Sequence, residues 1–393
     1  MPILALALGF LVSLFAALLL VPTVCRVARR VGWLDEPDGT RKIHRDAVPN
    51  VGGLAIVGAA VVGIGVMTVA RIELPRSISG ALTLPDPLVV LGALGIAAVG
   101  FWDDRRAMSH RAKFVAQLVV TALAFAGGAR VMVFDAALGA GPLALAVSGL
   151  LTVVWMVGMM NAVNLVDGMD GLAAGVVAIA FVGLAGAHAL GGDLGALVLA
   201  AAVCGALLGF LRYNFAPATV FMGDSGSLFL GYALAAYALR GTAHPNPVLA
   251  LVIPAVIMGI PVLDTAVSIL RRKLTGQRLF YPDRDHIHHR LQAQMSTRRA
   301  ALTLYAFGAY LALGALAMAT MRPLAALVTF LFGSAAVYGF LGYVRYLPTP
   351  GRIVRYAERR QQVKSLVGRK LADTPRAGRV AHERFEPTAG PER

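Results

Sequence analysis

The stretch "ILALALGFLVSLFAALLLVPTV" (residues 3–24) contains no charged side chain. A helix of about 20 apolar residues is long enough to cross the hydrocarbon core of a bilayer. No basic region precedes this stretch and no cleavage site of small residues follows it, so we expect it to remain as a membrane span instead of being removed as a signal peptide. The stretch therefore predicts a helical membrane protein.

Apolar runs of similar length recur along the chain, which is 58% hydrophobic and 15% charged with a mean hydropathy of +0.70. Soluble domains are only about 45–50% apolar. We therefore predict an all-α, polytopic integral membrane protein with about eleven transmembrane helices. The predicted spans are residues 3–24, 51–70, 86–102, 113–129, 143–161, 172–190, 194–211, 226–240, 247–270, 301–320 and 324–343.

The basic residues fix the expected orientation of these spans. All Lys and Arg residues except Arg71, Arg76, Arg130, Arg240 and Arg322 fall on the same side when the loops are assigned alternately. Cytoplasmic loops carry the excess of positive charge, so the N-terminus is expected outside and the C-terminus in the cytoplasm. The net charge of +15 is thus explained by topology, and we expect no nucleic-acid partner.

Two regions are predicted: a transmembrane domain over residues 1–345 and a basic, loosely ordered cytoplasmic tail over residues 346–393. The tail mixes Arg, Pro, Gly and Glu with few apolar residues, a composition that does not support a packed core. The two cysteines, Cys25 and Cys204, have no neighbours at metal-ligand spacing and indicate neither a disulfide framework nor a zinc site.

The first polar cluster is "GFWDDRRAMSHRAK" (residues 100–113), where Asp103 and Asp104 end the third span and Lys113 begins the fourth. Magnesium needs only one or two carboxylates from a protein, since water and phosphate oxygens complete its octahedron. Two adjacent aspartates followed by cations therefore suit a divalent ion and a phosphate. The alternative is that the pair merely ends the span in solvent.

The second cluster is "NAVNLVDGMDGLAAG" (residues 161–175), in which Asn161, Asn164, Asp167 and Asp170 recur every third residue. On a helix these side chains drift slowly around one side and form a polar stripe. Helix capping would need only one or two of them. We therefore predict a binding site here.

The third cluster is "FMGDSGSLFLGY" (residues 221–232), where Asp224 lies in a turn of small residues. Such a turn allows backbone N–H groups to approach a phosphate or a metal-bound ligand. Taken alone, it is equally typical of an ordinary helix start.

The fourth cluster is "YPDRDHIHHRL" (residues 281–291), with His286, His288, His289 and Arg290 close together. Three histidines can bind zinc, but no Cys or Glu completes a familiar ligand set. Histidine and arginine also make donors for a diphosphate, and we favour that interpretation. In the preceding span Asp264 is a costly intramembrane carboxylate, which indicates either a functional residue or a structural pair.

These clusters, together with "RKIHRDAVPNVGGLAI" (residues 41–56), resemble in sequence and order the polyprenyl-phosphate N-acetylhexosamine-1-phosphate transferase superfamily, glycosyltransferase family 4. The resemblance runs from about residue 25 to 300. It implies transfer of a sugar 1-phosphate from a UDP-sugar to a polyprenyl (undecaprenyl-type) phosphate with release of UMP. The cofactor it implies is Mg²⁺, with Mn²⁺ as a substitute.

The resemblance also implies roles for individual residues. It makes Asp224 a magnesium ligand, with Asp103, Asp104 and Asp167 as further ligands and catalytic residues. The histidines His286, His288 and His289 are implied to be catalytic, and the substrate contacts implied are Lys42, His44, Arg45, Lys113, Asn161, Asn164, Asp170 and Arg290.

The HxHHR form of the histidine cluster resembles the N-acetylglucosamine branch of the superfamily. Phospho-N-acetylmuramoyl-pentapeptide transferases carry a Pro-x-His-His-His cluster there and give the alternative specificity. A transporter is the non-enzyme alternative, but transporters bind substrate near the bilayer midplane, whereas these acids lie at one face. The resemblance places the chain in the bacterial cytoplasmic membrane with its active site facing the cytoplasm, and the sequence leaves a monomer or a homodimer open.

Overall fold

The computed structural model describes residues 2–35, 47–73, 85–132, 139, 141–240, 247–274, 286–344 and 346. The predicted contacts Lys42, His44 and Arg45 lie outside these residues, as does the tail from residue 347. The chain divides into two compact units, Met1–Ser268 with Pro282–Tyr346 and Ile269–Tyr281 with Leu347–Arg393. The first unit contains every described residue of the predicted site.

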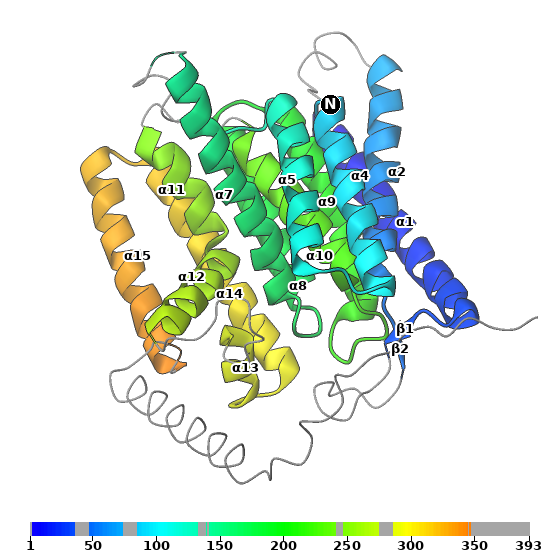
Figure 1. Cartoon of the computed structure of the whole chain (residues 1–393). Helices are drawn as coiled ribbons and strands as arrows, with labels where there is room; N and C mark the ends of the chain where they lie inside the picture. The colour runs from blue at the N-terminus through cyan, green and yellow to red at the C-terminus, as the bar shows by residue number, and fades with distance from the viewer. Residues whose placement is uncertain are drawn as a thin grey trace, which may run out of the picture. The chain divides into compact units, whose positions relative to one another are not determined.

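The described residues are almost entirely helical, which confirms the predicted all-α class (Figure 1). A short antiparallel pair, β1 (Leu34–Asp35) with β2 (Val48–Pro49), is the only sheet among them. The helices are α1 (Pro2–Val31), α2 (Gly52–Glu73), α4 (Pro87–Arg105), α5 (His110–Ala126), α7 (Pro142–Val166), α8 (Leu172–Leu190), α9 (Leu194–Asn214), α10 (Gly223–Leu239), α11 (Pro247–Ile257), α12 (Gly259–Leu274), α13 (Ile287–Gln292), α14 (Thr297–Thr320) and α15 (Pro323–Tyr343).

A helix or helix pair occupies each of the eleven predicted spans. Among the described residues eight helices are long and apolar enough to cross a membrane, and a bent helix pair makes up to nine candidates. Helices α5 and α10 are shorter, with 17 residues each. The chain is therefore a multi-pass membrane protein, while the count of eleven and the orientation stay predictions.

The ninth predicted span, residues 247–270, is not one continuous helix. Two helices, Leu249–Ile257 and Gly259–Leu274, meet there at 90°. Pro261 has no N–H to donate to the carbonyl of Ile257, so the hydrogen-bond ladder is interrupted at this point. The prediction of a span over residues 247–270 used apolar length alone and gave no information about this bend.

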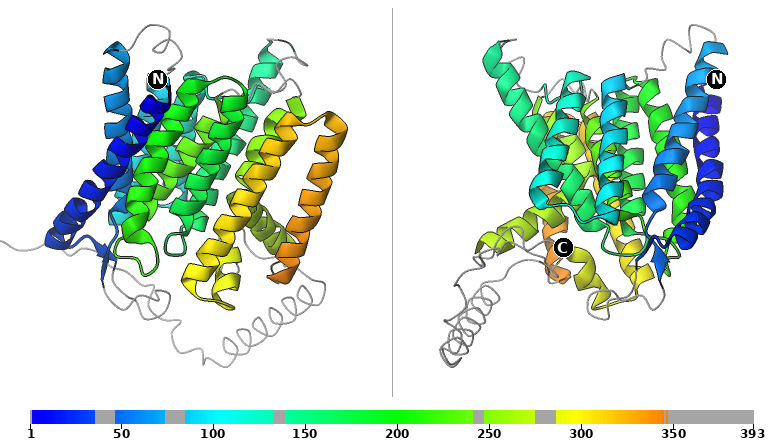
Figure 2. Two further views of the ribbon diagram at one scale, coloured as in Figure 1. Left: turned by 180° about the vertical axis from the view of Figure 1, so that it is seen from behind. Right: turned by 45° about the vertical axis from the view of Figure 1, so that its right-hand side comes forward.

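Helix α10 is the centre of the first unit. It packs against α2, α4, α7 and α8, and nearly every side chain from Ser225 to Ala238 is buried. Helix α1 lies along α9 and α2 at one edge of the unit, as the view from behind shows in blue and green (Figure 2). The first turn of α10, which contains Asp224, is thereby held among the surrounding helices.

Glycines allow the helices around this turn to approach closely. A Cβ added to Gly53 of α2 would lie 2.2 Å from the amide nitrogen of Gly226, and one added to Gly100 of α4 would lie 2.4 Å from the carbonyl oxygen of Asp224. Real Cβ atoms do not tolerate such distances, so larger residues would push α2 and α4 away from α10.

We expect Gly53→Ala to destabilise the protein by about 1–3 kcal/mol, because overpacking a close contact displaces backbone. Gly65→Ala is the matched control on the same helix, since a Cβ there meets nothing within 4 Å. It should be neutral or stabilising by up to about 1 kcal/mol, the difference in helix propensity. Thermal unfolding of the purified proteins in detergent measures both, and equal unfolding temperatures would contradict the packing described.

Candidate active site

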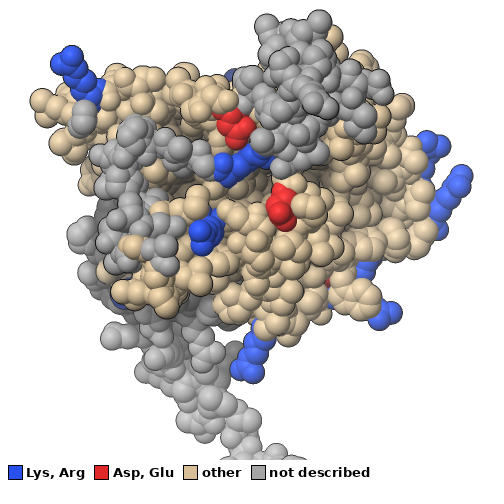
Figure 3. Space-filling view, turned by 90° about the horizontal axis from the view of Figure 1, so that it is seen from above, with Lys and Arg blue, Asp and Glu red and all other residues tan. Residues whose placement is uncertain are grey.

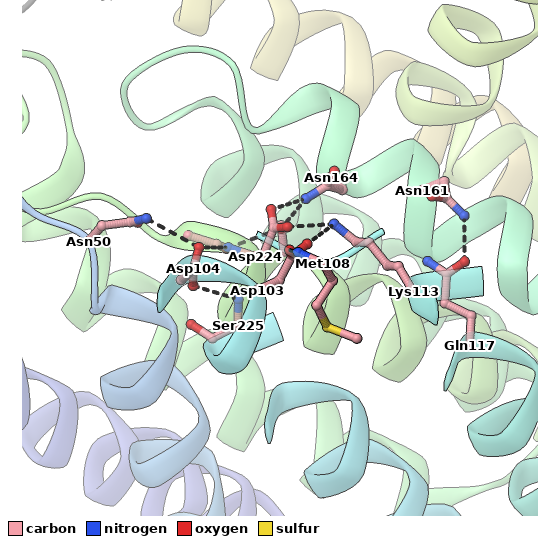
Figure 4. A network of polar contacts seen from close by, with 12 residues as sticks. Asn50, Asp103, Asp104, Met108, Lys113, Gln117, Asn161, Asn164, Asp224 and Ser225 are labelled. Carbon is pink, nitrogen blue, oxygen red and sulfur yellow. Dashed lines mark hydrogen bonds and ion pairs between the residues drawn. The ribbon is translucent and has the colours of Figure 1, made fainter. Parts of the chain in front are cut away.

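Four helices bring their polar ends together at one end of the bundle. Asp103 and Asp104 lie in the last turn of α4, Lys113 in the first turn of α5, and Asp224 in the first turn of α10. Asn164 comes from the last turn of α7. Figure 4 shows these side chains pointing toward one another, so three of the predicted clusters form one acidic centre.

The Lys113 ammonium connects two of the carboxylates. Its Nζ lies 2.5 Å from Oδ2 of Asp224 and 3.0 Å from Oδ2 of Asp103. The other oxygen of Asp224 accepts a hydrogen bond of 2.7 Å from Nδ2 of Asn164, and the other oxygen of Asp103 accepts one of 2.6 Å from the amide of Met108. These side chains are partly exposed, with 17% for Lys113 and 29% for Asp224, so a ligand can reach them.

Asp104 anchors the start of α10. Its Oδ1 accepts the amide of Asp224 at 2.9 Å, and its Oδ2 accepts the amide of Ser225 at 3.1 Å. Nδ2 of Asn50 adds a third hydrogen bond of 3.2 Å. The sequence left open whether the N–H groups of this turn face a phosphate or form an ordinary helix start, and in the structure those of Asp224 and Ser225 donate to Asp104. This carboxylate satisfies the free donors that every helix start exposes.

Asp167, at the end of α7, has no hydrogen-bond or ion-pair partner among the residues that the structure describes. Burial raises the pKa of its carboxyl well above the usual value, and the negative charges of Asp224, Asp104 and Asp170 raise it further. Three carboxylates thus act on Asp167, and no described cation is among the causes of its pKa shift. An additional cation would relieve this repulsion.

The donor set fits a divalent metal ion. The described residues hold no ready group of three metal-ligating side chains. Magnesium does not require one, since one or two carboxylates suffice when substrate phosphates supply the other oxygens. The Lys113 ammonium already lies between two carboxylate oxygens, which marks a position of strong negative potential. The residues that would hold the ion are Asp224, Asp103 and Asp167, of which Asp167 has a carboxylate without a partner among the described residues.

The histidine cluster lies beside the "NAVNLVDGMDGLAAG" segment. Nε2 of His288 is so close to Gly168 that a Cβ on this glycine would be 2.5 Å away. The rings of His286 and His288 are parallel, with centroids 5.8 Å apart, and His289 lies 4.2 Å from His288. His288 is buried, and neither of its ring nitrogens hydrogen-bonds to a described residue. The fourth cluster therefore joins the same region.

Two predicted substrate contacts already have protein partners. Nδ2 of Asn161 donates to Gln117 at 3.0 Å, and Oδ2 of Asp170 accepts the amide of Ala218 at 2.9 Å. These contacts fix α5 against α7 and the loop after α9 against the loop after α7. Asn161 also donates to the carbonyl of its own helix at Val157. Their predicted roles toward substrate stay predictions.

Sequence reasoning missed several supporting residues. Asn50 binds Asp104, Gln117 binds Asn161, and Asn214 accepts the amide of Gly171 at 3.0 Å while donating to Val220. Gln117 had a detectable signal, because a polar residue four positions after Lys113 lies on the same helix face. Asn50 lies between β2 and α2, and Asn214 is the last residue of α9. At such element ends no periodicity identifies a partner.

Among the residues that the structure describes, the opposite end of the bundle has no comparable group of carboxylates linked by a cation. Figure 3 views that end, and its described surface shows only scattered charged side chains. Asp193 there caps α9 through the amide of Ala196 and pairs with Arg240 at 3.3 Å. A cavity of about 500 Å³ between α2, α4, α9 and α10 includes Asp193 and Arg240 but no residue of the acidic centre, and its lining is mainly apolar.

Several known proteins are similar to this chain in sequence. Residues 87–242 match the family described as glycosyl transferase family 4. The probable undecaprenyl-phosphate N-acetylglucosaminyl 1-phosphate transferase of Bacillus subtilis (strain 168) is 37% identical over 315 residues, covering 79% of this chain and 84% of that protein. The decaprenyl-phosphate N-acetylglucosaminephosphotransferase of Mycobacterium tuberculosis (strain CDC 1551 / Oshkosh) is 36% identical over 323 residues, covering 76% and 78%.

A third relative represents the alternative specificity. The phospho-N-acetylmuramoyl-pentapeptide-transferase of Geobacillus kaustophilus (strain HTA426) is 33% identical over 324 residues, covering 78% of this chain and 94% of that protein.

The fold and the site define a multi-pass membrane protein with a carboxylate-rich centre at one end of its helices. The chain belongs to glycosyl transferase family 4, which is a family of transferases. The family membership inferred from the five sequence motifs is thus confirmed.

Asp104→Ala should lower the stability of the protein. Removing the carboxylate leaves the amides of Asp224 and Ser225 without acceptors, at about 1–3 kcal/mol for each buried donor. Thermal unfolding in detergent measures this loss. Asp193→Asn, which conserves a capping oxygen at the other end, is the control and should stay within about 1 kcal/mol of wild type. An unchanged unfolding temperature for Asp104→Ala would contradict its anchoring role.

His288 should make the protein sensitive to acid. Burial, with the positive charge of His289, lowers the pKa of His288 to about 3, against 6.5 when exposed. The unfolded chain therefore binds this proton first, so stability is lost as the pH falls below 6.5, by up to about 1.4 kcal/mol per pH unit. His288→Gln should unfold at temperatures that change less between pH 7 and pH 5. If the unfolding temperatures of wild type and His288→Gln changed equally between pH 7 and pH 5, His288 would be excluded as a cause of the acid sensitivity.

Proposed function

We propose that the protein transfers N-acetylglucosamine 1-phosphate from UDP-N-acetylglucosamine to a polyprenyl phosphate, giving polyprenyl-diphosphate-N-acetylglucosamine and UMP. The observation that carries the proposal is the acidic centre. In it Lys113 links Asp103 and Asp224, and the carboxylate of the nearby Asp167 has no partner among the residues that the structure describes. Two anionic substrates can meet there only where cations balance them. The names of the Bacillus and Mycobacterium relatives, a probable undecaprenyl-phosphate N-acetylglucosaminyl 1-phosphate transferase and a decaprenyl-phosphate N-acetylglucosaminephosphotransferase, support this choice of sugar and lipid.

The position of the centre suits a lipid phosphate. Its carboxylates lie in the terminal turns of α4 and α10, so a polyprenyl chain can stay in the bilayer while its phosphate reaches the helix ends. A transporter would instead bind its substrate near the midplane. The excess of basic residues in the loops on this side supports an active site that faces the cytoplasm of a bacterial cell.

The nucleophile is an oxygen of the lipid phosphate. A phosphate monoester has a second pKa of about 6 and is largely ionised near neutral pH, so it needs no strong base. Asp103 already accepts hydrogen bonds on both oxygens, from Met108 and Lys113, which suits a residue that holds groups in place. We therefore favour direct attack on the sugar-linked phosphorus over a covalent aspartyl phosphate. Positioning of the two substrates and neutralisation of their negative charge then account for the rate enhancement.

Asp224, Asp103 and Asp167 are the proposed magnesium ligands. When bound, the ion neutralises negative charge on the transferred phosphoryl group. Lys113 binds the phosphate oxygens of the lipid or of the diphosphate. Asn164 orients Asp224 through its amide, which keeps the carboxylate turned toward Lys113.

The histidine cluster supports N-acetylglucosamine as the sugar. His288 lies next to Gly168, and His286 and His289 lie against His288. From there the three rings can donate to the diphosphate of the UDP-sugar together with Arg290. The HxHHR sequence favours N-acetylglucosamine, whereas the Geobacillus relative supports a phospho-N-acetylmuramoyl-pentapeptide as the second candidate. UMP release measured with a panel of UDP-sugars distinguishes these two candidate specificities.

Purified protein in detergent should release UMP from UDP-N-acetylglucosamine and a polyprenyl phosphate when Mg²⁺ is present, and EDTA should stop the reaction. Asp224→Asn and Asp103→Asn should each lower turnover by about 100-fold or more, because each removes charge-stabilising contacts at the reacting phosphates. Thermal unfolding confirms that the variants are folded.

The matched control is Asp193→Asn, which changes the same residue type at the opposite end of the bundle and should keep wild-type turnover. Near-normal turnover by Asp224→Asn or Asp103→Asn would remove that residue from the mechanism. Turnover with only the N-acetylmuramoyl-pentapeptide donor would select the second candidate.

A further inference from the structure

Asp264 is an ionisable residue in an apolar helix that the acidic centre does not use. It lies on α12, five residues after the bend that separates this helix from α11, and its exposed fraction is 1%. A buried carboxylate is costly unless it is fully hydrogen-bonded. Its partners therefore reveal what it does.

Among the described residues, the partners of the Asp264 carboxylate come from the histidine segment and from Tyr346, which follows α15. Oδ2 lies 2.9 Å from Nδ1 of His286, and Oδ1 accepts the amide of Ile287 at 2.9 Å. The hydroxyl of Tyr346 donates to Oδ1 at 2.5 Å, and this tyrosine is 1% exposed. One carboxylate thus holds the start of α13 and the chain beyond α15.

The contact with His286 also determines where the ring carries its proton. An ionised carboxylate is only an acceptor, so Nδ1 of His286 must be the N–H nitrogen. Nε2 is then the nitrogen left for a substrate, and it can donate to a phosphate oxygen only when the ring carries a proton on both nitrogens. Asp264 balances the charge of that form, which an uncharged Asn at this position would not do. A carboxylate behind a histidine has this orienting effect in many enzymes.

The orientation of the His286 ring also affects the neighbouring histidine. The ring of His286 is parallel to that of His288, which in turn lies against Gly168 next to Asp167. A rotation of His286 would therefore disturb the stack that joins the histidine segment to the acidic centre.

We propose that Asp264 is a positioning residue that fixes the ring orientation and the protonated nitrogen of His286, so that Nε2 of this histidine is presented to the diphosphate of the substrate. The inference rests on the proposed function for its substrate, but the geometry of the Asp264–His286 pair does not depend on it. Asp264 itself touches no substrate.

Asp264→Asn is the decisive variant. Its amide oxygen can still accept from Ile287 and Tyr346, while its NH₂ group donates to Nδ1 and moves the ring proton to Nε2. The hydrogen bonds and the shape are kept, so the unfolding temperature should stay close to that of wild type. We expect kcat to fall by about 100-fold or more, with the KM for UDP-N-acetylglucosamine changed by less than about threefold.

Two further variants separate positioning from mere packing. Asp264→Glu keeps the carboxylate and should recover part of the lost kcat, which a purely structural defect would not allow. Asp193→Asn, remote from the site, should keep wild-type kcat. A wild-type kcat for Asp264→Asn, or a loss fully explained by less folded protein, would overturn the proposal.

The ¹⁵N NMR spectrum of histidine-labelled protein tests the proposal without any activity. His286→Gln assigns the signal. We expect the His286 proton on Nδ1 in wild type and on Nε2 in Asp264→Asn, and no change between them would refute the inference. Absence of UMP release by the wild-type protein with every donor would instead refute the proposed function. The NMR result would then still test the role of Asp264 by itself.

Discussion

Carboxylates at the ends of apolar helices must be paired, and the Lys113 ammonium between Asp103 and Asp224 is the interaction on which the site depends. It holds the ends of α4, α5 and α10 together even though like charges would separate them. Asp104 completes the arrangement, because its two oxygens satisfy the first amides of α10. The same side chains that stabilise the helix ends therefore create a place where anions and a cation can bind.

Much of this arrangement was predictable from the sequence. Apolar length located the helices, and the motif order indicated that the loops at one face form one site. The break between α11 and α12 was not predicted, since apolar length does not report the missing N–H of Pro261. Asp104 accepts the amides at the start of a helix about 120 residues further along the chain, a contact that the sequence did not indicate, while its predicted role at a metal stays a prediction. Periodicity identifies the face of a helix on which a polar residue lies and gives no information about a distant partner.

The structure gives the polar residues different tasks. Asp104, Asn161 and Asp170 are engaged mainly by the protein and hold loops or helix ends. Asp167 has no partner among the described residues, and its surplus negative charge favours a divalent ion. Asp264 organises the histidine segment from behind. This division explains why a membrane protein retains so many acids at one face: some build the site and others are left for its ligands.

Binding of Mn²⁺, followed by EPR on the purified protein, tests the central claim most directly, because Mn²⁺ replaces Mg²⁺ at oxygen ligands. With UDP-N-acetylglucosamine present, we predict one bound ion per chain, lost in Asp224→Asn and retained in Asp193→Asn. Equal Mn²⁺ binding by wild type and Asp224→Asn would show that the acidic centre is not the place where the metal and the diphosphate meet.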